Sequence, residues 1–403
     1  MKSLKELYRI GPGPSSSHTL GPQRACLKFK SETENAQQYE AHLYGSLSLT
    51  GKGHLTDYII KETLKPKPCH VFFHSDTLEH PNTMILRAFS NKKCEKEWVV
   101  YSIGGGAIKI KGEENESELE GKDVYPHEFL DDIKKYCNEH KMTFLDYINA
   151  NEDIDEYMNQ ILNQMLETVD RGLHKEGFLP GKLKLERCAK KLYDIANRMD
   201  YEERSKMLIS SYAYAAAEEN ASGGITVTAP TLGSSGVLPA VMYYYYYNKG
   251  VDKKILADAL KVGGLFGNLI KHNATISGAK GGCQAEIGAA CSMASAAVAF
   301  IQRLNDRQIE SAAEIGMEHH LGLTCDPVGG YVMIPCIERN AVAALRSMDN
   351  AFLTKYLGNI RESKVSFDMV VNTMNYTGKK LPVELKETSL GGLAVEVPFD
   401  NKE

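Results

Sequence analysis

Three cysteines in the last third of the chain stand in segments rich in glycine and proline. Cys283 follows a Gly-Gly pair, Cys325 precedes an Asp-Pro turn signal, and Cys336 follows a proline. Turns of this kind can direct several thiolates to one point, as an iron–sulfur cluster requires. However, the spacing of 41 and then 10 intervening residues matches no compact zinc or ferredoxin motif. Spacing alone therefore leaves two interpretations open, a metal site or three buried small apolar side chains.

The other six cysteines show no partner pattern. Cys291 falls in an Ala-rich, helix-forming segment, so we expect it in the core. An odd total of nine cysteines in a long chain does not indicate a disulfide framework. The remaining five are predicted to be structural: Cys26, Cys69, Cys94, Cys137 and Cys188.

The segment Gly11–Thr19, GPGPSSSHT, runs from a Gly/Pro-rich loop into a helical stretch. Hydroxyl side chains such as those of Ser15, Ser17 and Thr19 cap helix starts, and the N–H groups there can bind a carboxylate. His18 has the side chain of a general base, with a pKa near the operating pH. An ordinary capped helix in a surface loop is the alternative.

A second segment, Ala229–Gly236 (APTLGSSG), repeats this arrangement before another apolar helix. Its hydroxyl residues Thr231, Ser234 and Ser235 predict a second anion cradle. Two further histidines, His54 and His80, stand in polar turn segments, where a histidine taken alone is most often a surface residue.

Composition predicts a soluble globular protein of two domains. The 403 residues are 43% hydrophobic and 25% charged, and a net charge of −5 gives no reason to expect nucleic acid as a partner. The N-terminus lacks an apolar signal segment, so we expect a cytoplasmic protein. The longest apolar run, Ile287–Ile301, is shorter than the roughly 20 residues of a membrane span and predicts a buried helix.

The expected fold class is α+β, a small α/β N-terminal domain joined to a large all-α domain. Residues 1–124 carry strand-like runs, whereas helical patterns dominate residues 125–403. The acidic segment Lys111–Asp123 predicts an exposed loop or hinge between them. Strands are expected at three positions: His42–Leu49, Cys69–Phe73 and Trp98–Ile103.

Together these segments resemble the bacterial iron–sulfur-dependent L-serine dehydratases (L-serine ammonia-lyases) with both domains on one chain. The resemblance runs almost end to end, and the small domain resembles the allosteric substrate-binding domain of some phosphoglycerate dehydrogenases. The motifs that carry it are GPGPSSSHT, GKGHLTD, HPNTM, EENASGG, TAPTLGSSGVLPAV, ISGAKGGCQAEIGAACSMA, MEHHLGLTCDPVGGYV, IPCIERN and KETSLGGLA.

The resemblance implies a 4Fe–4S cluster held by Cys283, Cys325 and Cys336, with one iron left open as a Lewis acid for the serine hydroxyl. It implies a site between the two domains in a homodimer that degrades serine to pyruvate and ammonia. His18 is the first candidate for the base that removes the Cα proton, followed by His54 and His80. The implied substrate-binding residues are Ser15, Ser17, Thr19, Asn82, Thr231, Ser234 and Ser235.

Three positions depart from the family pattern. No cysteine follows Cys336, so we do not expect the tail to ligate the open iron, as it does in some members. Leu232 stands where many relatives have a small polar or sulfur-containing residue. Lys280 stands where an acid is usual, three residues before a cysteine of the implied cluster.

Two other functions compete with serine dehydration. A cysteine desulfidase would use similar chemistry, and Leu232 suits a less polar β-substituent, whereas threonine would need room for its extra methyl group. In a different class, a degenerate relative would bind serine between its domains as a regulatory protein. PLP and NAD enzymes are not indicated, because a Schiff-base lysine beside a phosphate cradle and a GxGxxG motif after a strand are both missing from the sequence.

Overall fold

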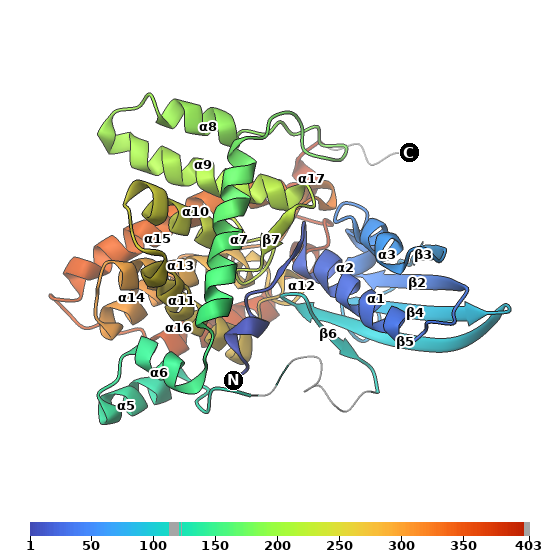
Figure 1. The fold of residues 1–403 in the computed structure, drawn as a ribbon, viewed down its shortest axis with the longest axis horizontal. Coiled ribbons are helices and arrows are strands. Elements are labelled where there is room, and N and C mark those ends of the chain that lie inside the picture. The colour runs from blue at the N-terminus through green and yellow to red at the C-terminus, as the bar shows by residue number, and fades with distance from the viewer. Residues whose placement is uncertain (113–120, 122, 399–403) are drawn as a thin grey trace.

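The computed structural model describes residues 1–112, 121 and 123–398. A small twisted sheet lies at one side of a large helical body (Figure 1). This arrangement confirms the predicted α+β fold class. The predicted loop or hinge at Lys111–Asp123 falls mostly outside the described residues.

The small region is built around a five-stranded sheet in the order β3-β2-β4-β5-β6, in which only β2 and β3 run parallel. Every second residue of β2 is buried, which is the alternation of a sheet covered on one face. The strands are β2 Gln38–Gly45, β3 Cys69–Phe73, β4 Asn82–Ser90, β5 Lys93–Gly104 and β6 Ala107–Ile110.

Two helices, α1 (Gly21–Ser31) and α3 (Thr56–Leu64), cover one face of this sheet (Figure 1). Phe29 of α1, Ile60 of α3 and Leu86 of β4 are completely buried in the core between them. The end of the sheet at which β2 finishes faces the helical body, since Ser46 Oγ donates to the backbone oxygen of Glu387.

Two of the three strand predictions are confirmed and one is partly wrong. Cys69–Phe73 is β3, and Trp98–Ile103 lies within β5. The predicted strand His42–Leu49 ends early, at Gly45, because this glycine adopts φ +57° and the chain turns into the short helix α2, Ser46–Leu49. Alternating apolar residues continue through the turn, so the pattern could not reveal it.

The helical body is organised around α13 (Ile287–Ile301), which packs against α11, α14 and α15. The segment Cys283–Ile301 is long and apolar enough to cross a membrane, yet 83% of it is buried inside the protein, as predicted for a core helix. The helices are α5 Leu130–His140, α6 Phe144–Asn151, α7 Asp155–Leu173, α8 Ala189–Ala196, α9 Tyr201–Ala221, α10 Val237–Tyr243, α11 Lys253–Asn273, α12 Gly278–Gly281, α13, α14 Asp306–Glu318, α15 Cys336–Leu357, α16 Phe367–Lys380 and α17 Leu393–Glu396.

The first twelve residues pack with the helical body rather than with the sheet. Leu4, Leu7 and Tyr8 are fully buried in the helical core. Strand β1 (Ile10–Pro12) pairs antiparallel with β7 (Ile225–Val227). The chain therefore leaves the helical body and enters the small region at the GPGPSSSHT segment, while the predicted boundary between residues 124 and 125 stays a prediction.

Close helix packing in the core predicts a penalty for even one added methyl group at Gly263 of α11. A Cβ atom there would lie 2.6 Å from the backbone oxygen of Met293 in α13. Helix propensity favours alanine over glycine by about 1 kcal/mol, but the helices would have to separate, at a cost of about 1–3 kcal/mol. We expect Gly263→Ala to lower the melting temperature, measured by circular dichroism. Lys254→Ala at an exposed position of α11 is the control, and an increase in melting temperature for Gly263→Ala would contradict this packing.

Candidate active site

The SSSHT segment forms one wide helical turn, Ser16–Leu20, which leads into α1. Ser15 caps this turn, since its Oγ accepts a hydrogen bond from the His18 amide at 3.1 Å. The Thr19 hydroxyl donates to the backbone oxygen of His54 at 3.1 Å. All three side chains are buried, so this is an interior turn rather than a surface loop.

Hydrogen bonds around His18 determine which ring nitrogen carries its proton. Its Nε2 lies 3.1 Å from Ser46 Oγ and 3.0 Å from Thr50 Oγ1. Both hydroxyl protons are used elsewhere, because Ser46 donates to the oxygen of Glu387 and Thr50 to that of Ser46. Nε2 must therefore be the donor, which leaves the lone pair on Nδ1.

His54 is fixed in the opposite tautomer. Its Nδ1 lies 2.9 Å from the carbonyl oxygen of Thr50 and must donate to it, so the lone pair is on Nε2. That lone pair faces Glu387 Oε1 at 3.8 Å, and His18 Nδ1 faces the same oxygen at 3.5 Å. The two imidazole rings stack with centroids 4.3 Å apart. Two lone pairs from the small region thus meet one carboxyl group from the helical body.

Burial keeps this cluster uncharged. It lowers the pKa of His18 well below its usual value, with a further contribution from His54, and lowers the pKa of His54 to about 4. Burial, reinforced by the charge of Glu286, raises the pKa of Glu387 well above its usual value. The three ligand atoms lie within 4.8 Å of one another, so the cluster could hold either a shared proton or a metal ion.

Backbone geometry fixes the position of each of the three late cysteines. Cys283 follows Gly282, which adopts a φ of +74°, and a Cβ atom at Gly282 would lie 2.7 Å from the Leu323 oxygen, so this position requires glycine. The amide of Cys325 donates to Leu385 at 2.8 Å, and its carbonyl accepts from Glu387 at 2.7 Å. Cys336 is the first residue of α15.

The three cysteines lie close enough to influence one another's pKa values. Cys283 and Cys325 share a hydrogen bond, which lowers the pKa of Cys283 to about 7, with help from Arg339. The same bond raises the pKa of Cys325, while burial and the Cys283 charge raise the pKa of Cys336. The half-buried Arg339 lies beside Cys283, and its positive charge favours the thiolate form of that cysteine.

Glu286 lies beside these thiols, with Oε2 3.9 Å from Cys325 Sγ. Burial raises its pKa to about 8, and Thr231 supplies a hydrogen bond. A side chain at Gly278 would overlap the same carboxyl group, since a Cβ atom there would lie 2.7 Å from Oε2. The Gly-rich turn before Cys283 therefore makes room for a buried acid beside the thiols.

The APTLGSSG segment lies in the same interior region, through the bond between Thr231 and Glu286. Thr231 and Ser234 bond to each other at 3.1 Å, whereas the buried Ser235 Oγ has no partner in the described structure. Leu232, one of the family departures, is completely buried.

His80 and Asn82 flank Pro81 at the start of β4, and neither bonds to His18 or His54 among the described residues. His80 Nε2 and both amide atoms of Asn82 are buried without partners. Burial, with a contribution from Lys280, lowers the pKa of His80 to about 4. Buried polar atoms without a protein partner are candidates for contact with a ligand or an ordered water.

Glu286, Arg339 and Glu387 lie within motifs that carry the family resemblance, but the sequence predicted no role for them. Each is a charged side chain within a Gly-, Ala- or Pro-containing segment that also carries or contacts a cysteine. A charged residue inside such a segment could have indicated a functional role, because a buried charge must have a partner. That Glu387 would meet His18 and His54, more than 300 residues earlier, could not be read from spacing.

Comparison with known proteins identifies the family of this chain. A family model described as serine dehydratase alpha chain matches residues 31–394. The chain belongs to this family. It is 37% identical over 458 aligned positions to L-serine dehydratase 1 of Escherichia coli K12, covering 99% of this chain and all of that protein. It is also 37% identical to the L-serine dehydratase of Helicobacter pylori 26695 and 35% identical to that of Haemophilus influenzae, covering 97–98% of this chain and 98–99% of those proteins. The family predicted from the motifs is confirmed.

The low pKa of His54 predicts a specific dependence of stability on pH. The unfolded chain, with a histidine pKa near 6.5, binds a proton that the folded state, at about 4, does not. Above pH 6.5 His54 is neutral in both states and does not change the free energy of unfolding. As the pH falls from 6.5 toward 4, protonation of the unfolded chain lowers the free energy of unfolding, by about 3 kcal/mol in total. We expect His54→Gln to flatten the fall in urea-unfolding free energy over this range, compared with the exposed control His174→Gln. Parallel pH profiles for the two variants would contradict a buried neutral His54.

Proposed function

We propose that this chain is an L-serine dehydratase that converts L-serine to pyruvate and ammonia. The observation that carries the proposal is the meeting of His18 and His54 with Glu387, whose backbone is bonded to Cys325. This joins a set of proton acceptors to a set of thiols in one buried site. From the family resemblance we also propose that the protein is a cytoplasmic homodimer.

The thiols fit the 4Fe–4S cluster that the family resemblance implies. Cys283, Cys325 and Cys336 are soft ligands of the type that iron–sulfur clusters need, and three of them leave one iron open. Arg339 lies beside Cys283 and would offset negative charge on a ligated site. When bound there, such a cluster supplies a Lewis acid for the β-hydroxyl group of serine.

We assign the base to His54, although His18 was the first candidate from sequence. His18 Nδ1 lies 3.3 Å from Ser15 Oγ, which can donate to it. Among the described residues, His54 Nε2 faces only Glu387 Oε1, at 3.8 Å, which is beyond hydrogen-bond distance. Its lone pair is therefore available for the Cα proton of a substrate, and its low pKa keeps it in the basic form at neutral pH.

The chain's own residues then carry the reaction as follows. His54 Nε2 takes the Cα proton, while the Thr50 carbonyl holds the opposite N–H and stabilises the imidazolium that forms. The Cβ–O bond breaks as the Cα–Cβ double bond forms, and the hydroxyl group leaves with the abstracted proton as water. The resulting aminoacrylate tautomerises to an imine, which a water molecule hydrolyses to pyruvate and ammonia. Glu387 Oε1, which faces a nitrogen of each ring, can exchange the abstracted proton with His18.

Binding of the substrate's polar groups falls to atoms that have no partner in the described protein. The hydroxyls of Ser15 and Thr19 are used in internal hydrogen bonds. The amide of Asn82 and the hydroxyls of Ser235 and Ser277 are buried without partners. We therefore assign substrate binding to Asn82 and Ser235, and a supporting role to the SSSHT hydroxyls.

Metal content and product together test the proposed function. Protein purified without oxygen is expected to carry about four irons per chain, and to release pyruvate from L-serine faster than sulfide from L-cysteine. Cys336→Ser should lose both iron and activity, whereas Cys94→Ser, at an exposed position of β5, should keep both. Faster sulfide release would change the substrate to cysteine. A protein that binds serine, stays free of iron and forms no product would instead be the regulatory relative.

Separate substitutions distinguish the two histidines. We expect His54→Asn to lower kcat roughly 10²- to 10⁴-fold with iron content unchanged, because the base is lost. His18→Asn should lower kcat less and shift the acid limb of the kcat profile, because the proton-sharing partner is lost. The reverse order of effects, in variants with equal iron content, would return the role of base to His18.

A further inference from the structure

A pocket of about 850 Å³ lies where the small region meets helices α12 and α16. Ser46 and Pro81 line it from the small region, and Lys280, Lys379 and Lys386 line it from the helical body. Apolar side chains such as Met374, Val383 and Leu390 complete its wall.

The three lysines are brought together by a close contact between two glycines. A Cβ atom at Gly378 of α16 would lie 3.0 Å from the Cα of Gly281 in α12. Lys280 precedes one of these glycines and Lys379 follows the other, so both lysines lie at this helix contact. Lys386 Nζ donates to the backbone oxygen of Gly378 at 3.2 Å, which holds the third ammonium group at the same point.

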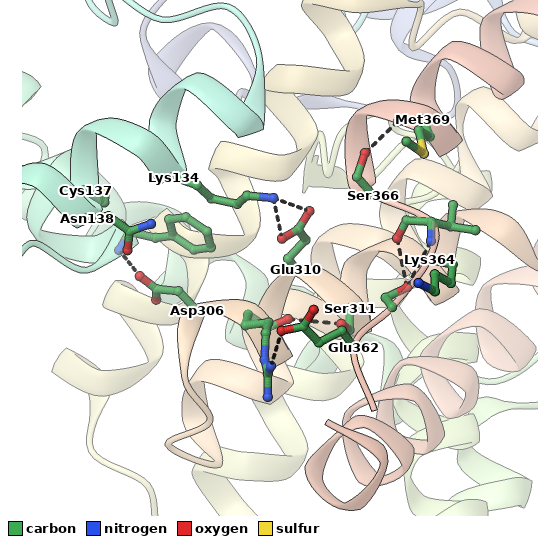
Figure 2. A pocket seen from close by; sticks show the side chains of 14 residues that line it. Lys134, Cys137, Asn138, Asp306, Glu310, Ser311, Glu362, Lys364, Ser366 and Met369 are labelled. Carbon is green, nitrogen blue, oxygen red and sulfur yellow. Dashed lines mark hydrogen bonds and ion pairs between the residues drawn. The ribbon is translucent and has the colours of Figure 1, made fainter. Parts of the chain in front are cut away.

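No acidic residue offsets these charges among the described residues that line the pocket. A second pocket, of about 580 Å³ (Figure 2), shows the opposite arrangement. There Lys134 pairs with Glu310 at 3.0 Å and Arg307 with Glu362 at 3.3 Å, and Asp306 balances Lys364 in number. The pocket of Figure 2 is balanced in charge, whereas the pocket at α12 and α16 carries three positive charges.

The positive pocket adjoins the candidate active site. Its lining residue Ser46 bonds to both His18 and the Glu387 backbone. Its lining residue Pro81 lies between His80 and Asn82, whose unpartnered atoms are buried. A ligand in the pocket therefore lies next to Ser46, which is hydrogen-bonded to His18, and next to Pro81, which precedes Asn82 in the sequence.

We propose that this pocket binds a small organic carboxylate anion, through Lys280, Lys379 and Lys386. Three uncompensated cations favour an anion over a zwitterion of zero net charge. The apolar wall favours a carbon-containing anion over a fully hydrated inorganic one. The identification of that anion with the 2-oxo acid product rests on the proposed function, whereas the preference for carboxylates does not. The pocket then attracts the anionic product in preference to the zwitterionic substrate.

Calorimetric titration of the anaerobically purified protein with sodium pyruvate tests this site without any turnover. We expect saturable binding that weakens when NaCl is raised from about 0.05 M to about 0.5 M, because salt screens the lysines. Lys379→Gln and Lys280→Gln should each raise the Kd about fivefold, the effect of one unit charge roughly 8 Å away at an effective dielectric constant of roughly 40. Inorganic phosphate should compete only weakly.

The control is Lys364→Gln, which removes the same charge from the pocket of Figure 2 and should leave the Kd unchanged. Equal weakening by Lys364→Gln and Lys379→Gln would show a general charge effect and overturn the site, as would tight competition by phosphate or no binding of pyruvate. Because the readout is binding, a protein that fails to dehydrate serine can still bind pyruvate here, so the two proposals fail separately.

Discussion

The site depends on the short parallel pairing of Cys325 with the chain around Lys386. Two backbone hydrogen bonds, from Cys325 to Leu385 and from Glu387 to Cys325, fix a thiol and a carboxyl group relative to each other. Glu387 then reaches the two histidines of the small region. A late segment of the chain thereby connects the thiol chemistry of one region to the proton chemistry of the other.

Burial gives this arrangement its electrostatic character. A charged histidine or carboxylate without a partner would be costly in such an interior, so the pKa values of His54 and Glu387 move toward their neutral forms. The neutral imidazole is the form that accepts a proton. The rings of His18 and His54 are almost completely buried, so any charge that forms during a reaction must be stabilised by nearby fixed groups such as the Thr50 carbonyl.

Local patterns predicted much of the architecture and only part of the site. Apolar and strand-forming runs identified α13 and β3, and the Gly- and Pro-containing turns singled out Cys283, Cys325 and Cys336, whose role as ligands stays a prediction. Sequence separation hid the rest, since Glu387 and His54 meet only through tertiary contacts. The turn at Gly45 was also missed, because its positive φ interrupts a pattern of residues that continues unchanged on both sides.

The pairing of β1 with β7 has a consequence for the order in which the chain folds. Ile10 lies opposite Val227, so this two-stranded sheet closes a loop that contains the entire small region. The five-stranded sheet can assemble from residues that are near one another in sequence, but β1 must wait until β7, more than 200 residues later, has left the ribosome. Strand β1 thus reaches its native position long after it is synthesised, and the active site, whose SSSHT turn follows β1 directly, is completed late.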